Sequence, residues 1–485
     1  MDTIGGMAVS GSVNADIGVI GLAVMGQNLA LNMENKGFRV AVYNRTGEKT
    51  KEFMAQRGEG KNIFPAYTLE EFVQSLARPR KVMLMVKAGA AVDAVIDQLL
   101  ELLEPGDVII DGGNSFFADT DRRTERVEAA GLHYLGTGVS GGEYGALHGP
   151  SIMPGGTPEA YQIVEPIFSR IAAQTDDGPC CAYMGSGSAG HYVKMVHNGI
   201  EYGIMQVLAE SYDLMHRGLG LTVDEVQKHF AEWNANELNS YLVEITAEIL
   251  ARMDEDTGQP LVSVIKDQAQ QKGTGKWTSQ SALDFGIPVP TITAAVDARI
   301  LSSFKPYREK AAQKLVPPDK PADLDANALT RSIRAAVYLS VVAAYAQGMQ
   351  LIAAASIEKN YGVTMHEVAR IWKDGCIIRS VLLDPIQQAY KDDPELHNLL
   401  FAEPFTSHVN ERIADLRETV IAAVRLGIPV PALSASLAYI DSYRSERLPA
   451  NLTQAQRDYF GAHTYERTDK PGTFHTPWQD IHSTL

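Results

Sequence analysis

The chain has 485 residues, which at ~150 residues per domain predicts two or three domains. Hydrophobic residues make up 45% of it and charged residues 21%, values typical of a folded globular protein and not of a disordered, collagenous or coiled-coil one. The net charge of −16 argues against nucleic acid as a partner. The three cysteines predict neither a disulfide framework nor a metal site. We expect no signal peptide, because no positively charged residues precede an apolar stretch near the N-terminus. We also expect no apolar run of ~18 residues that crosses a membrane, so the expected location is the cytoplasm.

Short β-branched runs alternate with helical patterns from Asp16 to about Met184. This alternation predicts an α/β domain with a Rossmann-like, doubly wound parallel sheet. After the Gly/Ser-rich stretch 185–190, apolar-periodic segments predict a large all-α domain, and the polar sequence beyond Leu448 predicts an extended tail. The expected domains are therefore 1–188, 189–447 and 448–485. The expected strands lie at 17–20, 40–43, 82–86, 108–110 and 133–135.

The all-α domain contains a weak internal repeat. Three short matches occur in the same order about 140 residues apart, which indicates a duplication, although Leu/Val/Glu-rich helices also match by chance. The matching pairs are Met205-Gln206 with Met349-Gln350, Val223–Val226 with Met365–Val368, and Ser240 with Ser380.

A glycine motif, Gly21–Gly26, follows the first predicted strand and opens a helix near Gln27. In this context a glycine turn presents backbone N–H groups to a pyrophosphate, although here Ala23 replaces the usual second glycine. The second strand ends with Arg45 between Asn44 and Thr46, without the acidic residue that would bind a free ribose 2′-hydroxyl. A guanidinium suits a 2′-phosphate instead, so the sequence favours NADP over NAD. An ordinary strand-to-helix turn with an exposed arginine is the alternative.

A predicted helix beginning near Ala189 carries four polar residues on one face, at spacings i, i+3, i+4 and i+7: Lys194, His197, Asn198 and Glu201. A solvated charge stripe is the alternative. The repeat favours a buried site, because the matching positions of the second copy are largely apolar: Tyr338, Val341, Val342 and Tyr345. Burying an ion costs several kcal/mol against a total stability of ~5–15 kcal/mol, so the polar copy is expected to line a cavity.

Three further segments carry candidate ligand-binding residues. Asp111–Ser115 and Ser140–Gly142 follow the fourth and fifth predicted strands, at the edge where open α/β sheets bind ligands. Lys272 and Lys276 flank a glycine turn, which suits either a phosphate site or a solvated loop.

Together these residues resemble the decarboxylating 6-phosphogluconate dehydrogenase family, within the β-hydroxyacid dehydrogenase superfamily. The resemblance covers the chain from Ile17 to about Trp478, and the segment Gln456–Glu466 is highly specific to the family. It implies oxidative decarboxylation of 6-phosphogluconate to ribulose 5-phosphate and CO2 with reduction of NADP, a step of the pentose phosphate pathway and of gluconate utilisation. It further implies a homodimer with shared active sites and no metal, nucleic-acid or membrane partner.

The resemblance also implies roles for particular residues. Lys194 would be the general base for the hydroxyl on carbon 3 while hydride leaves that carbon for the nicotinamide, and Glu201 would protonate carbon 1 of the enediol that decarboxylation leaves. NADP would be held by Gly21, Leu22, Ala23, Val24, Met25, Gly26, Asn44, Arg45, Thr46, Val86, Lys87, Ala88 and Asn114. Substrate would be held by Asn114, Ser140, Gly141, Gly142, His197, Asn198, Tyr202, Lys272 and Arg299, and by Arg457 and His463 from a second subunit.

The chain departs from the family motif in one segment. After the substrate serine the family reads Gly-Gly-Glu-Glu-Gly-Ala-Arg, whereas this chain has Tyr144 and Leu147 in place of the second glutamate and the arginine. Losing both members of a possible ion pair leaves no charge unpaired.

Two rival functions follow from the same residues. One is a dehydrogenase for a smaller, unphosphorylated acid, against which the cationic Lys272, Arg299 and Arg457 argue. The other is a catalytically silent NADP-binding protein, against which the intact Lys194 and Glu201 argue.

Overall fold

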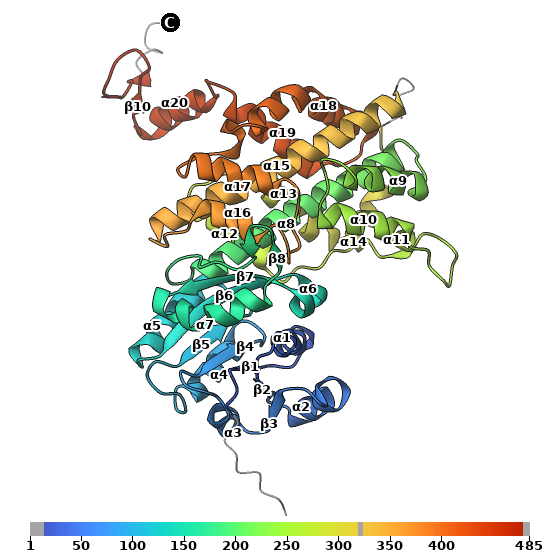
Figure 1. Ribbon diagram of the computed structural model, residues 1–485. Coiled ribbons are helices and arrows are strands. Elements are labelled where there is room, and N and C mark those ends of the chain that lie inside the picture. The colour runs from blue at the N-terminus through green and yellow to red at the C-terminus, as the bar shows by residue number, and fades with distance from the viewer. Residues whose placement is uncertain (1–13, 319–323, 479–485) are drawn as a thin grey trace, which may run out of the picture. The chain divides into compact units, whose positions relative to one another are not determined.

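The computed structural model describes residues 14–318 and 324–478. The chain forms two compact units, Met1–Ser436 and Leu437–Leu485. The first unit contains a seven-stranded sheet with its helices, followed by a bundle of long helices (Figure 1). The predicted boundaries after residues 188 and 447 stay predictions.

The sheet has the strand order β3-β2-β1-β4-β5-β6-β7, and all neighbours are parallel except β6 and β7. Its strands are β1 (Ile17–Ile20), β2 (Val40–Tyr43), β3 (Ile63–Ala66), β4 (Lys81–Leu84), β5 (Val108–Asp111), β6 (His133–Ser140) and β7 (Ser151–Gly156). Its helices are α1 (Val24–Asn35), α2 (Gly47–Phe53), η1 (Met54–Gly58), α3 (Leu69–Gln74), α4 (Ala90–Leu99), α5 (Phe117–Ala129), α6 (Gly142–His148) and α7 (Pro158–Ile171).

The structure confirms the five predicted strands and adds two edge strands, β3 and β7. Both contain proline, Pro65 and Pro154, which lowers strand propensity and confines a strand to the edge of a sheet. The helix after β1 begins at Val24, three residues before the predicted start at Gln27.

Helices cover both faces of the sheet, as a doubly wound fold requires. Ile17 and Val19 of β1 belong to one apolar cluster with helices α1 and α7, whereas Ile20 belongs to another with α3 and α4. The strand order reverses between β1 and β4. Ligands bind at such a switch point, beyond the carboxyl ends of the strands.

Helix α8 (Ala189–Asp213) begins where the sequence predicts and packs closely on β6 and β7. A Cβ added at Gly190 would lie 2.2 Å from the carbonyl oxygens of Gly136 and Met153, and one added at Gly138 would lie 2.3 Å from Lys194 Cβ. The absence of these side chains lets the predicted catalytic helix lie directly on the end of the sheet.

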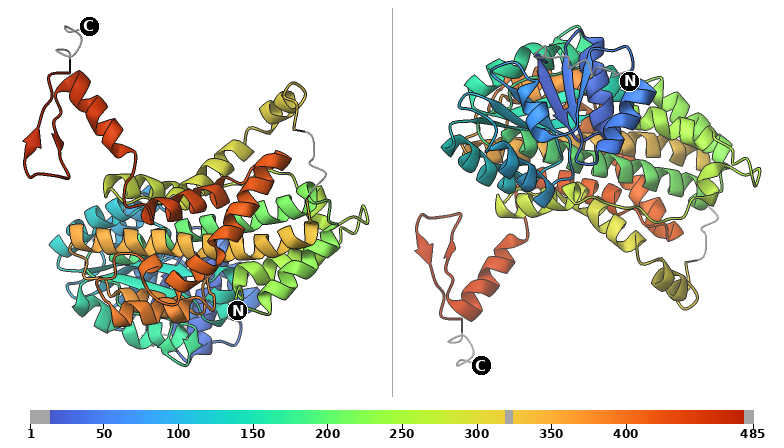
Figure 2. Two further views of the ribbon diagram at one scale, coloured as in Figure 1. Left: turned by 90° about the horizontal axis from the view of Figure 1, so that it is seen from above. Right: turned by 90° about the horizontal axis from the view of Figure 1, so that it is seen from below.

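The helical bundle is built around α8 and α15, which pack against each other (Figure 2). Its elements are η2 (Leu214–Gly218), α9 (Val223–Asn234), α10 (Tyr241–Ala251), α11 (Leu261–Val264), α12 (Thr274–Asp284), α13 (Pro290–Ser302), α14 (Lys305–Ala312), α15 (Ala326–Glu358), α16 (Met365–Ile371), α17 (Leu383–Asp392), η3 (Leu399–Phe401) and α18 (Phe405–Leu426). A further short hairpin, β8 (Gln174–Thr175) and β9 (Gly178–Pro179), precedes α8, and α19 (Pro431–Tyr443) runs across the boundary of the two units.

The order of the helices is the one that an internal duplication predicts. Helices α8, α9 and α10 have counterparts in α15, α16 and α17, and the matched residues Val223 and Met365 each begin a helix. The matched residues Ser240 and Ser380 form an antiparallel bridge with each other.

One helix within the described residues, α15, is long and apolar enough to cross a membrane, although the sequence analysis expected none. The most apolar window of α15 is 94% buried inside the protein, so its composition is that of a core helix.

The second unit is more regular than the predicted extended tail. It contains α20 (Ala450–Gly461) and a hairpin of β10 (Tyr465–Glu466) and β11 (Thr473–Phe474). Helix α20 has only one buried residue, Asp458, so it lacks the apolar stripe by which helices are recognised in a sequence. The helix ends at Gly461, and Ala462 after it has a φ of 48°.

Glycines of α8 provide a test of this packing. We expect Gly190→Ala to lower the midpoint of thermal unfolding, because a new Cβ meets two backbone carbonyls that cannot move aside, and overpacking typically costs ~1–3 kcal/mol. Gly203→Ala is the matched control on the same helix, since its Cβ would lie at an ordinary contact distance of 3.4 Å from Ala344 Cβ. That variant should be unchanged or stabilised by up to ~1 kcal/mol. Equal midpoints for the two variants would contradict the packing argument.

Candidate active site

The turn after β1 has the geometry of a dinucleotide site. Gly21 has a φ of +103°, and a Cβ there would lie 2.5 Å from the Met85 carbonyl oxygen, while one at Gly26 would lie 1.9 Å from the Gly21 carbonyl oxygen. The N-terminus of α1 has no side-chain cap and no acidic residue in its first turn. Its backbone N–H groups and the positive end of the helix dipole therefore suit a pyrophosphate.

The loop after β2 adjoins this turn through one hydrogen bond. The Leu22 backbone N–H donates to Asn44 Oδ1 at 3.1 Å, and the Asn44 amide nitrogen donates to the Thr46 carbonyl at 3.1 Å. Asn44 thereby shapes the loop, and Arg45 is exposed beside it. Arg45 forms no ion pair with another described residue, which leaves its guanidinium available to a 2′-phosphate.

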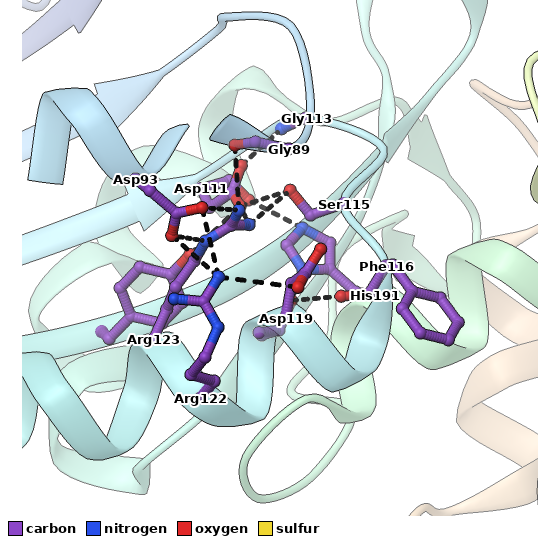
Figure 3. A network of polar contacts seen from close by, with 12 residues as sticks. Gly89, Asp93, Asp111, Gly113, Ser115, Phe116, Asp119, Arg122, Arg123 and His191 are labelled. Atoms are coloured by element: carbon purple, nitrogen blue, oxygen red, sulfur yellow. Dashed lines mark hydrogen bonds and ion pairs between the residues drawn. The ribbon is translucent and has the colours of Figure 1, made fainter. Parts of the chain in front are cut away.

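The turn that carries Asn114 is supported by a buried polar network (Figure 3). Asp111, the last residue of β5, accepts hydrogen bonds from Ser115 Oγ at 2.6 Å and from the Tyr134 hydroxyl at 3.1 Å. Arg123 of α5 donates to Ser115 Oγ at 3.3 Å and pairs with Asp93 of α4 at 2.9 Å. Asn114 itself is exposed, so the network fixes the backbone of the turn and leaves this side chain free to bind a ligand.

His191 joins this network to the helix α8. Its Nε2 lies 3.0 Å from the Asp111 carbonyl oxygen and its Nδ1 lies 2.7 Å from Thr120 Oγ1. Burial lowers the pKa of His191, so the ring is neutral, Nε2–H donates to the carbonyl and Nδ1 accepts from the hydroxyl. His191 therefore fixes the position of the Asn114 turn relative to the first turn of α8 (Figure 3).

The four polar residues of α8 lie on one face, as predicted. The Lys194 ammonium donates to Asn198 Oδ1 and lies 3.4 Å from His197 Nδ1, and His197 Nε2 lies 3.3 Å from Ser140 Oγ at the end of β6. His197 Nδ1 lies 3.9 Å from Glu201 Oε2. This face is not a solvated stripe, because Lys194 is only 6% exposed, His197 is fully buried, and Asn198 and Glu201 are half-buried.

Burial tunes the acid–base properties of these side chains. It lowers the pKa of Lys194, an effect that the negative charge of Glu201 partly opposes. It raises the pKa of the Glu201 carboxyl, against the opposing charges of Lys194 and Arg299. Burial and the charge of Lys194 hold the pKa of His197 well below its ordinary value, so His197 stays neutral. Burial therefore shifts the lysine toward its neutral form and the carboxyl toward its protonated form.

A second group of predicted residues lies around Tyr202. The Arg299 guanidinium lies 3.4 Å from the centre of the Tyr202 ring, and a Cβ at Gly275 would lie 2.4 Å from the same ring. Lys272 is exposed at the start of α12. Within the described residues neither Lys272 nor Arg299 pairs with a carboxylate, so both cations are available to an anionic group.

The remaining predicted residues are placed as follows. Val86, Lys87 and Ala88 follow β4 at the switch point, on the edge that also bears the glycine turn. Arg457 and His463 belong to the second unit, where both are exposed. Arg457 donates to Gln454 Oε1 at 3.1 Å and pairs with no carboxylate among the described residues.

Sequence reasoning missed several neighbours of the polar face. Thr274 Oγ1 accepts a hydrogen bond from the Asn198 amide at 3.1 Å, and its only sequence signal was its place in the glycine turn after Lys272. Trp372 contacts the His197 ring edge to face, with 5.5 Å between ring centres. Cys376 is fully buried near Lys194, and burial raises the pKa of its thiol. No sequence signal marked these two, because they reach the site from a segment far along the chain.

Comparison with known proteins identifies a class that matches this geometry. Residues 16–185 match the NAD binding domain of 6-phosphogluconate dehydrogenase, and residues 190–478 match the 6-phosphogluconate dehydrogenase C-terminal domain. A decarboxylating 6-phosphogluconate dehydrogenase of Synechococcus elongatus is 59% identical over 464 residues, 95% of this chain and 98% of that one. The NADP(+)-dependent decarboxylating enzyme of Bacillus subtilis is 56% identical over 463 residues, with the same coverage.

A solved structure agrees with these sequence relatives. The 6-phosphogluconate dehydrogenase of Plasmodium falciparum, described in apo form and in complexes with NADP+ and with 6-phosphogluconate, superimposes with a TM-score of 0.92 at 47% identity. The match covers 96% of this chain and 100% of that one. The fold and site thus define a two-domain nicotinamide-dependent dehydrogenase. The chain belongs to the 6-phosphogluconate dehydrogenase family.

Arg45 is the expected determinant of cofactor choice. Charge-assisted hydrogen bonds contribute ~1.5–3 kcal/mol, so Arg45→Ala should weaken NADP binding roughly ten- to hundred-fold and leave NAD binding nearly unchanged. Arg39→Ala is the matched control, because Arg39 adjoins the opposite end of β2 and forms only an exposed ion pair with Asp16. Isothermal titration calorimetry with each cofactor measures both affinities. Equal losses for NADP and NAD would remove Arg45 from this role.

Proposed function

We propose that the chain oxidatively decarboxylates 6-phosphogluconate to ribulose 5-phosphate and CO2 with reduction of NADP, and that Lys194 and Glu201 move the protons of this reaction. Lys194 carries the proposal. It is buried, pairs with no carboxylate among the described residues, and contacts only neutral polar groups of His197 and Asn198. A lysine in this setting is readily deprotonated, which is the property a general base needs. We place the reaction in the cytoplasm, as the composition of the chain predicts.

The residues of the glycine turn and the loops after β2 and β4 suit NADP. The uncapped N-terminus of α1 receives the pyrophosphate and Arg45 the 2′-phosphate. NADP, when bound, supplies the acceptor for the hydride that leaves carbon 3 of the substrate. The turn of Asn114 lies between the cofactor loops and α8, and Asn114 can therefore contact both ligands.

Lys194 accepts the proton of the carbon 3 hydroxyl as the hydride leaves. The resulting ammonium lies where negative charge develops on that oxygen during loss of CO2, and low local polarity strengthens this interaction. Glu201 lies about two helical turns further along α8 than Lys194. Burial raises the pKa of its carboxyl and so favours the protonated form, which can donate a proton to carbon 1 of the enediol. Ser140, His197 and Asn198 orient the substrate around Lys194.

Lys272, and Arg299 beside Tyr202, favour a phosphorylated substrate. Neither cation has a carboxylate partner among the described residues, and an arginine can bind a phosphate in a bidentate manner. A smaller, unphosphorylated acid would leave these charges unused. The discriminating assay mixes protein, NADP and 6-phosphogluconate and follows the absorbance of the reduced cofactor; 3-carbon and 4-carbon hydroxyacids serve as controls.

Lys194→Met and Glu201→Gln should each reduce kcat by ~10²–10⁴-fold, the usual contribution of a general acid or base. NADP binding should persist in both variants, since neither side chain belongs to the dinucleotide turn. Steady-state kinetics and cofactor titration on the same preparations measure the two quantities. Near wild-type turnover in either variant would exclude that residue from its role.

We also propose a homodimer in which the second unit of each chain completes the active site of the other. The support is chemical: Arg457 and His463 are exposed, and Arg457 has no carboxylate partner among the described residues. The second unit also exposes Tyr459 and Phe460, and such apolar surface is more stable when covered. A truncation after Arg447 should therefore abolish activity and weaken the dimer.

Mixed dimers give the sharper test of shared sites. Arg457→Ala and Lys194→Met subunits should each be inactive alone. After subunit exchange at equal amounts, half of the dimers are mixed and each has one intact site, so activity should return to about a quarter of wild type. No recovery, despite exchange demonstrated with differently tagged chains, would mean that each tail serves its own subunit.

A further inference from the structure

The substrate loop Ser140–Gly142 continues into α6, the segment in which the chain departs from its family. The loop turns sharply, with a φ of +114° at Gly141, and a Cβ there would lie 2.6 Å from the Gly375 carbonyl oxygen. Gly375 in turn accepts a hydrogen bond from the Ser151 backbone at 2.7 Å. One side of the loop is therefore packed against the backbone at Gly375, which this hydrogen bond holds in place.

The substituted side chains of α6 take little part in holding it. Tyr144 is 75% exposed, and its ring lies against the ring of His148 on the same helix, with 4.3 Å between centres. Leu147 packs against the apolar cluster of α1 and α7, where an aliphatic side chain is well accommodated. Neither side chain bonds to the loop among the described residues.

Two asparagines of α1 hold α6 by its backbone instead. Asn28 Nδ2 donates to the Glu143 carbonyl at 2.8 Å, and Asn32 Nδ2 donates to the Ala146 carbonyl at 3.1 Å and to the Ile171 carbonyl at 2.9 Å. Both asparagines are almost completely buried, at 6% and 1% exposure. They are four residues apart and so lie on one face of α1.

Arg57 fixes the orientation of the Asn28 amide. Its guanidinium donates to Asn28 Oδ1 at 2.8 Å and to Gln27 Oε1 at 3.1 Å. With its oxygen bound to a cation, Asn28 must direct its N–H group to the Glu143 carbonyl. The chain of bonds runs from η1 through α1 to the first turn of α6, immediately after the loop.

We infer that Asn28 and Asn32 are positioning residues for the substrate loop, and that they set its geometry independently of the side chains at 144 and 147. This inference rests on the proposed function of Ser140–Gly142 in binding 6-phosphogluconate. It explains how α6 keeps its place without the glutamate and arginine of the family motif, because the bonds that hold it end on backbone carbonyls.

The test compares Asn28→Asp with Tyr144→Glu. Asn28→Asp keeps the size of the side chain and can pair with Arg57, but it replaces the donor to Glu143 with a repelling oxygen. We expect KM for 6-phosphogluconate to rise about tenfold, with kcat and NADP affinity within about twofold of wild type, because the loop contributes uniform substrate binding. Tyr144→Glu puts a negative charge on α6 itself and restores the family residue. It should leave all three quantities within about twofold of wild type.

Each outcome decides the inference. An unchanged KM in folded Asn28→Asp overturns the inference. It is also overturned if Tyr144→Glu changes KM as much as Asn28→Asp does, because equal changes would indicate general repulsion of an anionic substrate. If Asn28→Asp does not fold, Arg57→Met takes its place: it frees the Asn28 amide to rotate and should raise the same KM by about three- to fivefold. An unchanged KM in Arg57→Met would then overturn the inference. The proposed function fails separately, through wild-type protein that does not turn over 6-phosphogluconate.

Discussion

The close packing of α8 on the end of the sheet is the constraint on which the active site depends. Glycines at 136, 138 and 190 let the helix approach β6 and β7 so closely that any Cβ at 138 or 190 would overlap neighbouring atoms. This contact buries Lys194, brings His197 against Ser140 and places His191 on the Asp111 carbonyl. The sheet and the helical bundle thus share one rigid element, and the loops after β5 and β6 are positioned from the same helix.

The same packing determines the chemistry. A buried ammonium without a carboxylate partner is unfavourable, because taking it out of water typically costs several kcal/mol of folding free energy. Asn198 and the neutral ring of His197 supply hydrogen-bonding groups but no charge. Burial therefore lowers the pKa of Lys194 and raises that of Glu201, and the opposite charges of the two groups only partly offset these shifts. A nearby carboxylate bonded to Lys194 would stabilise the fold and also raise this pKa, which would weaken the base.

Sequence reasoning found most of the sheet and the polar face, because both depend on local periodicity. Strands β1, β2, β4, β5 and β6 follow from β-branched runs, and the face of α8 follows from i, i+3, i+4 and i+7 spacing. Periodicity failed for β3 and β7, where proline interrupts the pattern, and for α20, whose helix has no apolar stripe. Strands β3 and β7 are instead defined by pairing with a neighbouring strand. The end of α20 is defined by hydrogen bonds such as that from the Thr464 backbone to Asp458.

The sequence by itself determined which polar residues share one face of α8 and their order along it, because the residue types and helical spacings of Lys194 and Glu201 are local properties. Only the tertiary structure decided what surrounds them. Thr274, Trp372 and Cys376 approach α8 from segments far along the chain, and Asn28 and Asn32 bond to backbone carbonyl groups of α6 more than a hundred residues away. Such distant contacts bury each group and thereby shift its pKa. Burial and pKa therefore depend on the packed fold and not on any local pattern.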